Sequence, residues 1–157
     1  MIIKTTLSEA TEKLKTNGSP SARLDAELIL AKLLNKTREW LLAHDDEKLT
    51  TKQVETYDKL IKRRLDHEPV GYINESIEFY GIDFFIDKRV LSPRVETEAI
   101  VEEVVAKAPA GSSLIDIGTG SGAIAIAIAQ NRPDLKITAT EVSRGALDVA
   151  KINAERI

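Results

Sequence analysis

Residues 114–129 read Leu-Ile-Asp-Ile-Gly-Thr-Gly-Ser-Gly-Ala-Ile-Ala-Ile-Ala-Ile-Ala, and this stretch decides the fold. Its first four residues predict a buried strand, the glycines predict a sharp loop, and the Ala-Ile run predicts an apolar helix. Glycine lets the backbone turn sharply and lets a ligand approach where a Cβ atom would intrude. We therefore expect a cradle for a nucleotide-like cofactor, with Asp116, Gly118, Gly120 and Gly122 lying where the strand becomes the helix.

The residues around this loop carry the polar groups that such a ligand needs. A helix that begins near Gly122 points free N–H groups and the positive end of its dipole at the bound molecule. Glu141 follows Gly118 by 23 positions, near the spacing at which a carboxylate accepts hydrogen bonds from ribose hydroxyls. A tight turn without a ligand and a solvated strand-end carboxylate are the simpler alternatives. The combination of strand, loop, helix and carboxylate favours a cofactor site.

Two classes of cofactor fit the loop. The series Gly118-x-Gly120-x-x-Ala123 satisfies the looser dinucleotide fingerprint of nicotinamide and flavin enzymes. A third glycine at Gly122, and Asp116 two places before the first glycine, favour the methyltransferase version. No Lys-Ser or Lys-Thr pair follows the glycines, which excludes a mononucleotide P-loop.

Residues 1–68 predict a small helical bundle. Four amphipathic stretches with apolar residues at helical spacing are joined by brief links. In the second stretch, Leu24, Leu28, Ala31 and Leu34 form an apolar stripe, with Ile29 and Leu30 beside it. We expect these helices to form one domain.

Residues 69–92 predict a β-hairpin linker, because Val70–Ile77 and Ile82–Ile86 are rich in β-branched and aromatic residues. Residues 93–157 predict a helix followed by one βαβα unit, whose second strand is Lys136–Thr140. A right-handed crossover should make the two strands parallel. The fold class is therefore α/β: a helical bundle, a hairpin linker and the first βαβα unit of a Rossmann-like sheet.

Composition limits the function classes. The 157 residues carry a net charge of −3 and no cysteine, so direct nucleic-acid binding and thiol catalysis are not expected. No cluster of ligand-type side chains predicts a metal site. The first residues lack the features of a signal peptide, and the apolar run Ala123–Ala129 is far shorter than the ~20 residues of a membrane helix. These features predict a cytoplasmic protein that does not bind a membrane.

Seven segments of the chain match the motifs of one known family. They are Ala-Arg-Leu-Asp-Ala-Glu-Leu (22–28), Arg-Glu-Trp-Leu-Leu-Ala-His (38–44), Glu-Pro-Val-Gly-Tyr-Ile (68–73), Glu-Phe-Tyr-Gly (78–81), Val-Leu-Ser-Pro-Arg-Val-Glu-Thr-Glu (90–98), the loop at 116–122 and Glu-Val-Ser (141–143). On these segments the chain resembles the HemK-type protein N(5)-glutamine methyltransferases, which modify a glutamine of peptide chain release factors. The resemblance extends over nearly the whole length.

This resemblance implies an S-adenosyl-L-methionine-dependent enzyme. It implies that the glycine loop wraps the methionine part of the cofactor and that Glu141 holds the ribose hydroxyls. It also implies that residues 1–68 recognise the release factor, and it places Ser92-Pro93-Arg94 near the mouth of the active site. The implied cofactor-binding residues are Asp116, Gly118, Thr119, Gly120, Ser121, Gly122 and Glu141.

The chain departs from the family pattern at several positions. Glu75 stands where the family usually has glycine, Ser92 replaces an aliphatic residue and Val95 replaces proline. Glu141 replaces the commoner aspartate. Glutamate keeps both acceptor oxygens and adds one methylene, so ribose binding should survive with adjusted geometry.

The family's Asn-Pro-Pro-Tyr motif does not occur in these 157 residues. In the family this motif accepts both N–H bonds of the substrate amide and aligns its nitrogen with the methyl–sulfonium bond, so catalysis is mostly orientation and electrostatics. We therefore assign no catalytic residue. We expect a truncated gene product, an engineered fragment or one half of a split enzyme, without methyl transfer of its own.

The strand Leu114–Ile117 is apolar on both faces, which is typical of a strand covered on both sides. We expect an open edge there that favours self-association, and we expect the helix Ala123–Ala129 to lose much of its cover. Two other functions remain open. One is a non-catalytic module that binds a release factor, and the other is a fragment of a nicotinamide-dinucleotide enzyme.

Overall fold

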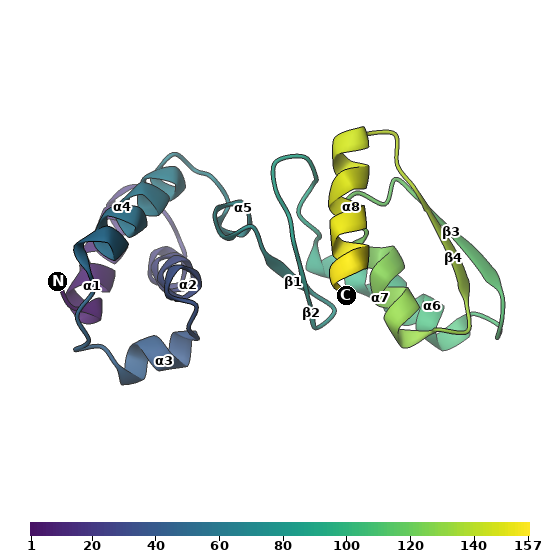
Figure 1. The fold of residues 1–157 in the computed structure, drawn as a ribbon, viewed down its shortest axis with the longest axis horizontal. Helices are drawn as coiled ribbons and strands as arrows, with labels where there is room; N and C mark the ends of the chain where they lie inside the picture. The colour runs from purple at the N-terminus through teal and green to yellow at the C-terminus, as the bar shows by residue number, and fades with distance from the viewer. The chain divides into compact units, whose positions relative to one another are not determined.

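The computed structural model describes residues 1–157, which divide into two compact units, Met1–Asn74 and Glu75–Ile157. In Figure 1 the first unit runs from purple to teal and the second from teal to yellow. The first unit is built from helices, and the second combines short strands with helices.

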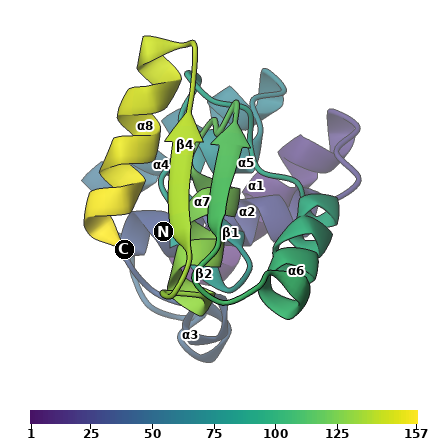
Figure 2. The same ribbon diagram turned by 90° about the vertical axis from the view of Figure 1, so that its right-hand side faces the viewer.

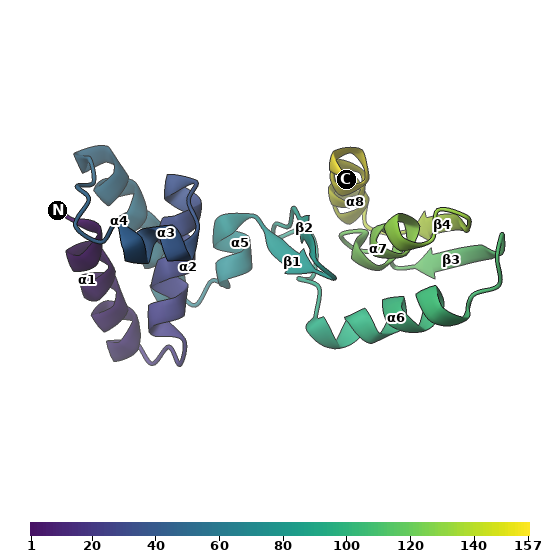
Figure 3. The same cartoon turned by 90° about the horizontal axis from the view of Figure 1, so that it is seen from below.

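The first unit is a helical bundle with its own hydrophobic core (Figure 3). Its helices are α1 (Ile3–Thr16), α2 (Ala22–Leu34), α3 (Arg38–Ala43), α4 (Thr51–Leu65) and α5 (Val70–Asn74). Tyr57 is buried among them, and its hydroxyl donates a 2.9 Å hydrogen bond to the Ala26 carbonyl oxygen, which satisfies its polar atom. The largest buried core residues are Ile3, Leu7, Leu14, Ile29, Leu30, Leu41, Tyr57 and Ile61.

Local signals in the sequence explain where these helices begin and end. Thr50 and Gln53 form a capping box at the start of α4, and the Thr37 hydroxyl accepts from the Trp40 N–H at the start of α3. α2 ends at Asn35, which adopts the left-handed conformation that asparagine tolerates. The four predicted helices are therefore confirmed.

The apolar stripe of α2 is only partly buried, and the residues beside it are buried more deeply. Leu24 is 41 % exposed, whereas Ala26, Ile29 and Leu30 are fully buried. α2 packs against α1, α3, α4 and α5. Because several helices surround it, one stripe at helical spacing does not describe its buried surface.

Two carboxylates lie buried in α2, and each is paired. Asp25 accepts hydrogen bonds from the Ser19 and Ser21 hydroxyls and from Arg64 Nε, the last at 2.8 Å. Glu27 accepts from Arg23 and from Arg38 Nη2, the latter at 2.7 Å. Pairing of this kind is what allows a charged group to be buried.

The predicted strand over Val70–Ile77 is wrong in its first half, because Val70–Asn74 forms α5. The Tyr72 and Ile73 N–H groups both donate to the Pro69 carbonyl oxygen, and Ile73 is buried in the core of the first unit. Burial of Ile73 among helices outweighs the β-propensity of the segment. The hairpin is limited to the antiparallel strands β1 (Ile77–Phe79) and β2 (Ile82–Phe84).

The second unit continues with one βαβα unit, as predicted. After the hairpin come η1 (Val95–Thr97), α6 (Glu98–Lys107), β3 (Ser113–Ile117), α7 (Ala123–Asn131), β4 (Lys136–Thr140) and α8 (Arg144–Arg156). β3 and β4 are parallel, with Ser113 opposite Lys136 and Ile117 opposite Thr140. Figure 2 shows the two strands in front, with α7 behind them and α8 and α6 at either side.

The helices of this unit cover one face of β3 and β4. Leu114 and Ile137 pack against the core, whereas Ile115 and Ile117 are 58 % and 79 % exposed on the other face. The helix α7 keeps its cover, contrary to expectation, because it packs against α6, β4 and α8. The buried residues of this core are Phe79, Phe84, Val101, Ala123, Ala127, Ile128 and Leu135. No helix of the chain has both the length and the apolar character needed to span a bilayer.

Candidate cofactor-binding site

The glycine loop joins β3 to α7 at the carboxyl ends of the two parallel strands. The N–H groups of Gly118 and Thr119 both donate to the Thr140 carbonyl oxygen, at 2.9 and 3.0 Å. These bonds continue the pairing of β3 with β4 and fix the start of the loop beside the end of β4. Ligands of open α/β sheets bind at this end of the strands.

Two glycines show why the loop requires this residue type. Gly122 has a φ of +83°, and an added Cβ would lie 2.9 Å from Ile126 Cδ1 and 3.4 Å from Ala150 Cβ. Gly120 has a φ of +58°, but nothing lies within 4 Å of the position that its Cβ would take. Gly122 therefore allows close packing beneath the loop, whereas Gly120 faces open space that a ligand can occupy.

Glu141, directly after β4, contacts the same loop. Its Oε2 accepts a 3.0 Å hydrogen bond from the Gly120 N–H, and its Oε1 accepts a 3.0 Å bond from the Ser143 N–H. The backbone N–H groups of Ser143 and Gly120 lower the pKa of the Glu141 carboxyl, because they stabilise its ionised form. The predicted spacing of loop and carboxylate thus brings an ionised side chain next to Gly120.

Asp116 also points towards the loop. Its Oδ2 accepts a 2.7 Å hydrogen bond from the Thr119 hydroxyl, which orients that residue at the first bend. Thr119 and Ser121 are both buried, with 8 % and 3 % of their surface exposed. All seven residues expected at the cofactor site therefore lie together at the carboxyl ends of β3 and β4.

A pocket of about 120 Å³ opens beside the loop. The Ser92-Pro93-Arg94 segment lines it together with Thr119 and Ser121, so the structure brings this segment to the loop. Leu91, Thr97 and Ile124 also line the pocket. Their residue types alone did not predict that they belong to the site. Only their positions in the sequence, close to the 92–94 segment and at the start of α7, could have predicted this. The full lining is Phe79, Leu91, Ser92, Pro93, Arg94, Thr97, Thr119, Ser121, Ala123 and Ile124.

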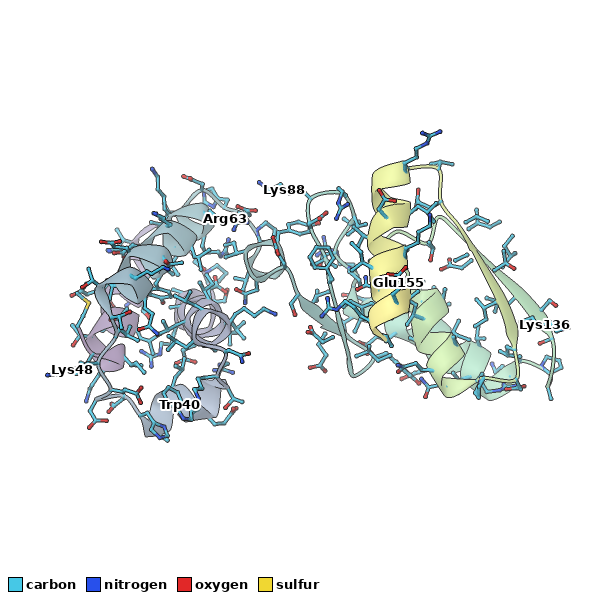
Figure 4. All side chains as sticks on the ribbon, in the orientation of Figure 1. Trp40, Lys48, Arg63, Lys88, Lys136 and Glu155 are labelled. Carbon is cyan, nitrogen blue, oxygen red and sulfur yellow. The ribbon has the colours of Figure 1, made fainter.

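Other hollows and side-chain clusters of the chain offer fewer groups that could bind a ligand. A hollow of about 500 Å³ on the first unit is lined by Glu12, Lys13, Thr16, Asn17 and Leu65 and has no glycine loop or strand end beside it. Trp40, labelled on α3 in Figure 4, stacks on His44 with ring centroids 4.2 Å apart. No group of three or more His, Cys, Asp or Glu side chains is placed to hold a metal ion.

A parallel βαβ crossover, a glycine loop at the strand ends and a carboxylate after the second strand define the opening part of a Rossmann-like unit for a nucleotide-like cofactor. Residues 5–74 match the PrmC N-terminal domain, and residues 95–157 match the methyltransferase small domain. The two stretches of the chain thus match these two domain families in turn, and the resemblance to the release factor glutamine methyltransferases is confirmed.

Similar proteins extend this match over the whole chain. A release factor glutamine methyltransferase of Koribacter versatilis is 40 % identical over 100 % of this chain and 57 % of its own length. One of Coxiella burnetii is 41 % identical over 96 % of this chain and 56 % of its own. A bifunctional methyltransferase of Rickettsia felis is 36 % identical over 97 % of this chain and 34 % of its own. The chain thus spans little more than half, or about a third, of these relatives.

Proposed function

We propose that this chain forms the substrate-recognition and cofactor-binding parts of an S-adenosyl-L-methionine-dependent methyltransferase that acts on a glutamine side chain of peptide chain release factors. The main observation behind the proposal is that the Glu141 carboxylate accepts a hydrogen bond from the Gly120 N–H at the carboxyl ends of the parallel strands. The matches of both units to domains of this family support it.

Glu141 keeps the acceptor capacity that a ribose requires. An ionised carboxylate has about four lone-pair sites, and the Gly120 and Ser143 N–H groups occupy two of them. The remaining sites would accept hydrogen bonds from the two ribose hydroxyls.

The loop would hold the methionine part of the cofactor. Gly120 leaves room for close approach, and α7 begins at Ala123 with free N–H groups that favour a negatively charged carboxylate. S-adenosyl-L-methionine supplies a methyl group on a sulfonium, so the protein has to bind it, exclude water and present the amide nitrogen in line with it.

In the family, the Asn-Pro-Pro-Tyr motif aligns the substrate amide. These 157 residues contain no such sequence, so they do not align the amide in that way. Well-oriented reactants can gain roughly 7–11 kcal/mol. We therefore expect the 157-residue chain to bind cofactor without measurable methyl transfer to a release factor, as assayed with radiolabelled methyl groups. Turnover by this chain would contradict that expectation.

Calorimetric titration tests the cofactor. S-adenosyl-L-methionine should bind the wild-type chain, and NADH should not. Glu141→Gln should weaken binding roughly tenfold, because a neutral amide accepts fewer and weaker hydrogen bonds. Glu155→Gln, an exposed change on α8 (Figure 4), is the matched control and should bind like the wild type. Binding of NADH alone would favour the dinucleotide alternative and overturn the proposal.

The pH dependence sharpens this test. Because the pKa of Glu141 lies below its ordinary value of 4.5, the carboxylate stays ionised down through that value. The affinity of the wild type for cofactor should be constant from pH 7 to pH 5 and fall only as the pH drops through the lowered pKa. An affinity already lost between pH 7 and pH 5, in a chain still folded by circular dichroism, would contradict this role of Glu141.

A binding assay with purified release factor tests the substrate class. The full chain should form a complex with the factor with or without cofactor, since the first unit is proposed to recognise it. A complex without any cofactor binding would instead support the non-catalytic binding module. Cofactor binding without a complex would remove the release factor from the proposal.

A further inference from the structure

Asn153 of α8 is fully buried, and its whole side-chain amide is hydrogen-bonded. Its Oδ1 accepts from the Phe85 N–H at 2.8 Å, and its Nδ2 donates to the Phe85 carbonyl oxygen at 2.9 Å. Its second amide hydrogen is available to the Ser121 carbonyl oxygen, which lies 2.9 Å from Nδ2. Asn153 thus joins the segment after β2 to the glycine loop.

The two contacts have different consequences. With Phe85 the Asn153 amide pairs with both backbone groups of one residue, as a neighbouring strand would. With Ser121 it fixes the carbonyl of the peptide directly before Gly122, the residue at which the loop passes into α7. Ala150, one turn earlier on α8, lies beneath Gly122. α8 therefore supports the end of the loop at two adjacent points.

The same residue bonds to the loop that lines the pocket and to the segment that follows the hairpin. Phe79 lines the pocket from the hairpin, and Ser121 lines it from the loop. Asn153 bonds to Ser121 itself and to Phe85, the residue that follows β2. Both amide hydrogens and the carbonyl oxygen are used, so only a side-chain amide at this distance from the backbone supplies the same three bonds.

We propose that Asn153 is a positioning residue for cofactor binding: it holds the Ser121–Gly122 peptide so that the loop N–H groups are already oriented before the cofactor arrives. This inference rests on the proposed cofactor function. Asn153 itself is not expected to touch the cofactor. Its contribution is to reduce the ordering that binding would otherwise require.

Substitution of Asn153 provides the test. Asn153→Leu removes all three bonds while keeping the branching and the number of side-chain heavy atoms, and Asn153→Asp keeps an acceptor for the Phe85 N–H but places a carboxylate against two carbonyl oxygens. Both variants should bind S-adenosyl-L-methionine at least tenfold more weakly than the wild type in calorimetric titrations at a temperature where circular dichroism shows them folded.

Two controls separate positioning from stability. Val101→Ala, in the buried core of the same unit, should lower the melting temperature but leave the dissociation constant within twofold. Asn131→Asp, at the exposed end of α7, should lower the melting temperature slightly, because its carboxylate faces the Ala127 carbonyl oxygen, but it should leave the dissociation constant unchanged. An unchanged dissociation constant in folded Asn153→Leu, or an equal loss in Val101→Ala, would overturn the proposal.

Hydrogen exchange on the cofactor-free proteins gives a second readout. The Gly122 N–H donates to the Thr119 carbonyl oxygen at 2.9 Å, and its exchange should be faster in Asn153→Leu than in Val101→Ala. Equal exchange would contradict the proposal. If the wild type binds no S-adenosyl-L-methionine, the proposed function fails, and this comparison still decides whether Asn153 orders the loop.

If both Asn153 variants are unfolded, the wild type alone decides the question. Cofactor should then slow exchange of the Phe85 N–H, which bonds to Asn153. No slowing on binding would show that Phe85, Asn153 and the loop are not coupled, and would overturn the proposal.

Discussion

The helical unit and the strand-containing unit differ in how they cover their large apolar side chains. In the first unit Leu24 and Leu42 are exposed, but they lie outside a closed core. In the second, Ile115 and Ile117 project from the uncovered face of β3. The difference shows that an amphipathic helix can satisfy its apolar face within a small bundle, whereas a strand that is apolar on both faces needs cover on two sides.

The candidate site lies on the second unit, whose sheet has an uncovered face. The glycine loop, Glu141 and the pocket all belong to the second unit, and they are held by hydrogen bonds to β4 and α8. A cofactor that binds only the folded form would stabilise this unit in proportion to its concentration. The stability of the first unit should not depend on cofactor.

The largest expected effect is in the first core. Leu30 is fully buried, so Leu30→Ala should destabilise the first unit by about 2–5 kcal/mol. The single tryptophan, Trp40, lies in this unit, and its fluorescence in a urea titration reports on it. Cofactor affinity should remain as in the wild type at low urea. Loss of both together would show that the two units do not behave separately.

The two glycines with different surroundings should respond differently. Gly122→Ala combines a left-handed φ with a Cβ 2.9 Å from Ile126 Cδ1, so it should cost about 2–4 kcal/mol from strain and overlap. Gly120→Ala faces open space and should cost only about 1–2 kcal/mol, while its methyl group would obstruct the proposed cofactor. Thermal unfolding and titration measure the two effects. Equal stability of the two variants would contradict the packing described for Gly122.

Glu27 tests the buried charge of the first unit. Burial raises the pKa of its carboxyl, but hydrogen bonds from Arg38 and Arg23 outweigh burial, so the pKa is lowered overall. Glu27→Gln should cost about 1–2 kcal/mol at pH 7, a modest value because both arginine side chains are partly exposed to water.

The sign of the pH effect follows from that lowered pKa. The ionised carboxylate stabilises the first unit fully above its ordinary pKa, and this contribution disappears as the pH falls through the lowered value. The difference between wild type and Glu27→Gln should therefore shrink in acid, as followed by Trp40 fluorescence. Glu9→Gln on the exposed side of α1 is the control and should show no difference.

The smallest expected effect on stability is at the open sheet face. Ile117 is 79 % exposed, so Ile117→Thr, which keeps a β-branched side chain, should change stability by less than about 0.5 kcal/mol. It should also reduce any self-association of the chain, because it removes apolar surface. Sedimentation at several concentrations measures this. A cost of several kcal/mol would mean that Ile117 is covered.

Local patterns in the sequence predicted the centre of the site well. The run at 114–129 is bounded by glycines, and the β-branched residues at Lys136–Thr140 lie between turn signals, so strand, loop, helix and strand appear where they were expected. The prediction was wrong at Val70–Asn74 because the β-branched Ile73 is buried in the helical core and Val70 packs against that core. Propensity describes a residue in isolation, and burial depends on its neighbours in space.

The sequence by itself determined the order of the elements, the positions of the glycines and the carboxylate after the second strand, because each depends on neighbours along the chain. Only the tertiary structure decided that Glu141 contacts Gly120, that the 92–94 segment lines the pocket and that Asn153 joins Phe85 to Ser121. An asparagine in a helix carries no sign in the sequence of which distant backbone groups it will meet. Those groups lie 68 and 32 residues away, and packing of α8 against the loop brings them together.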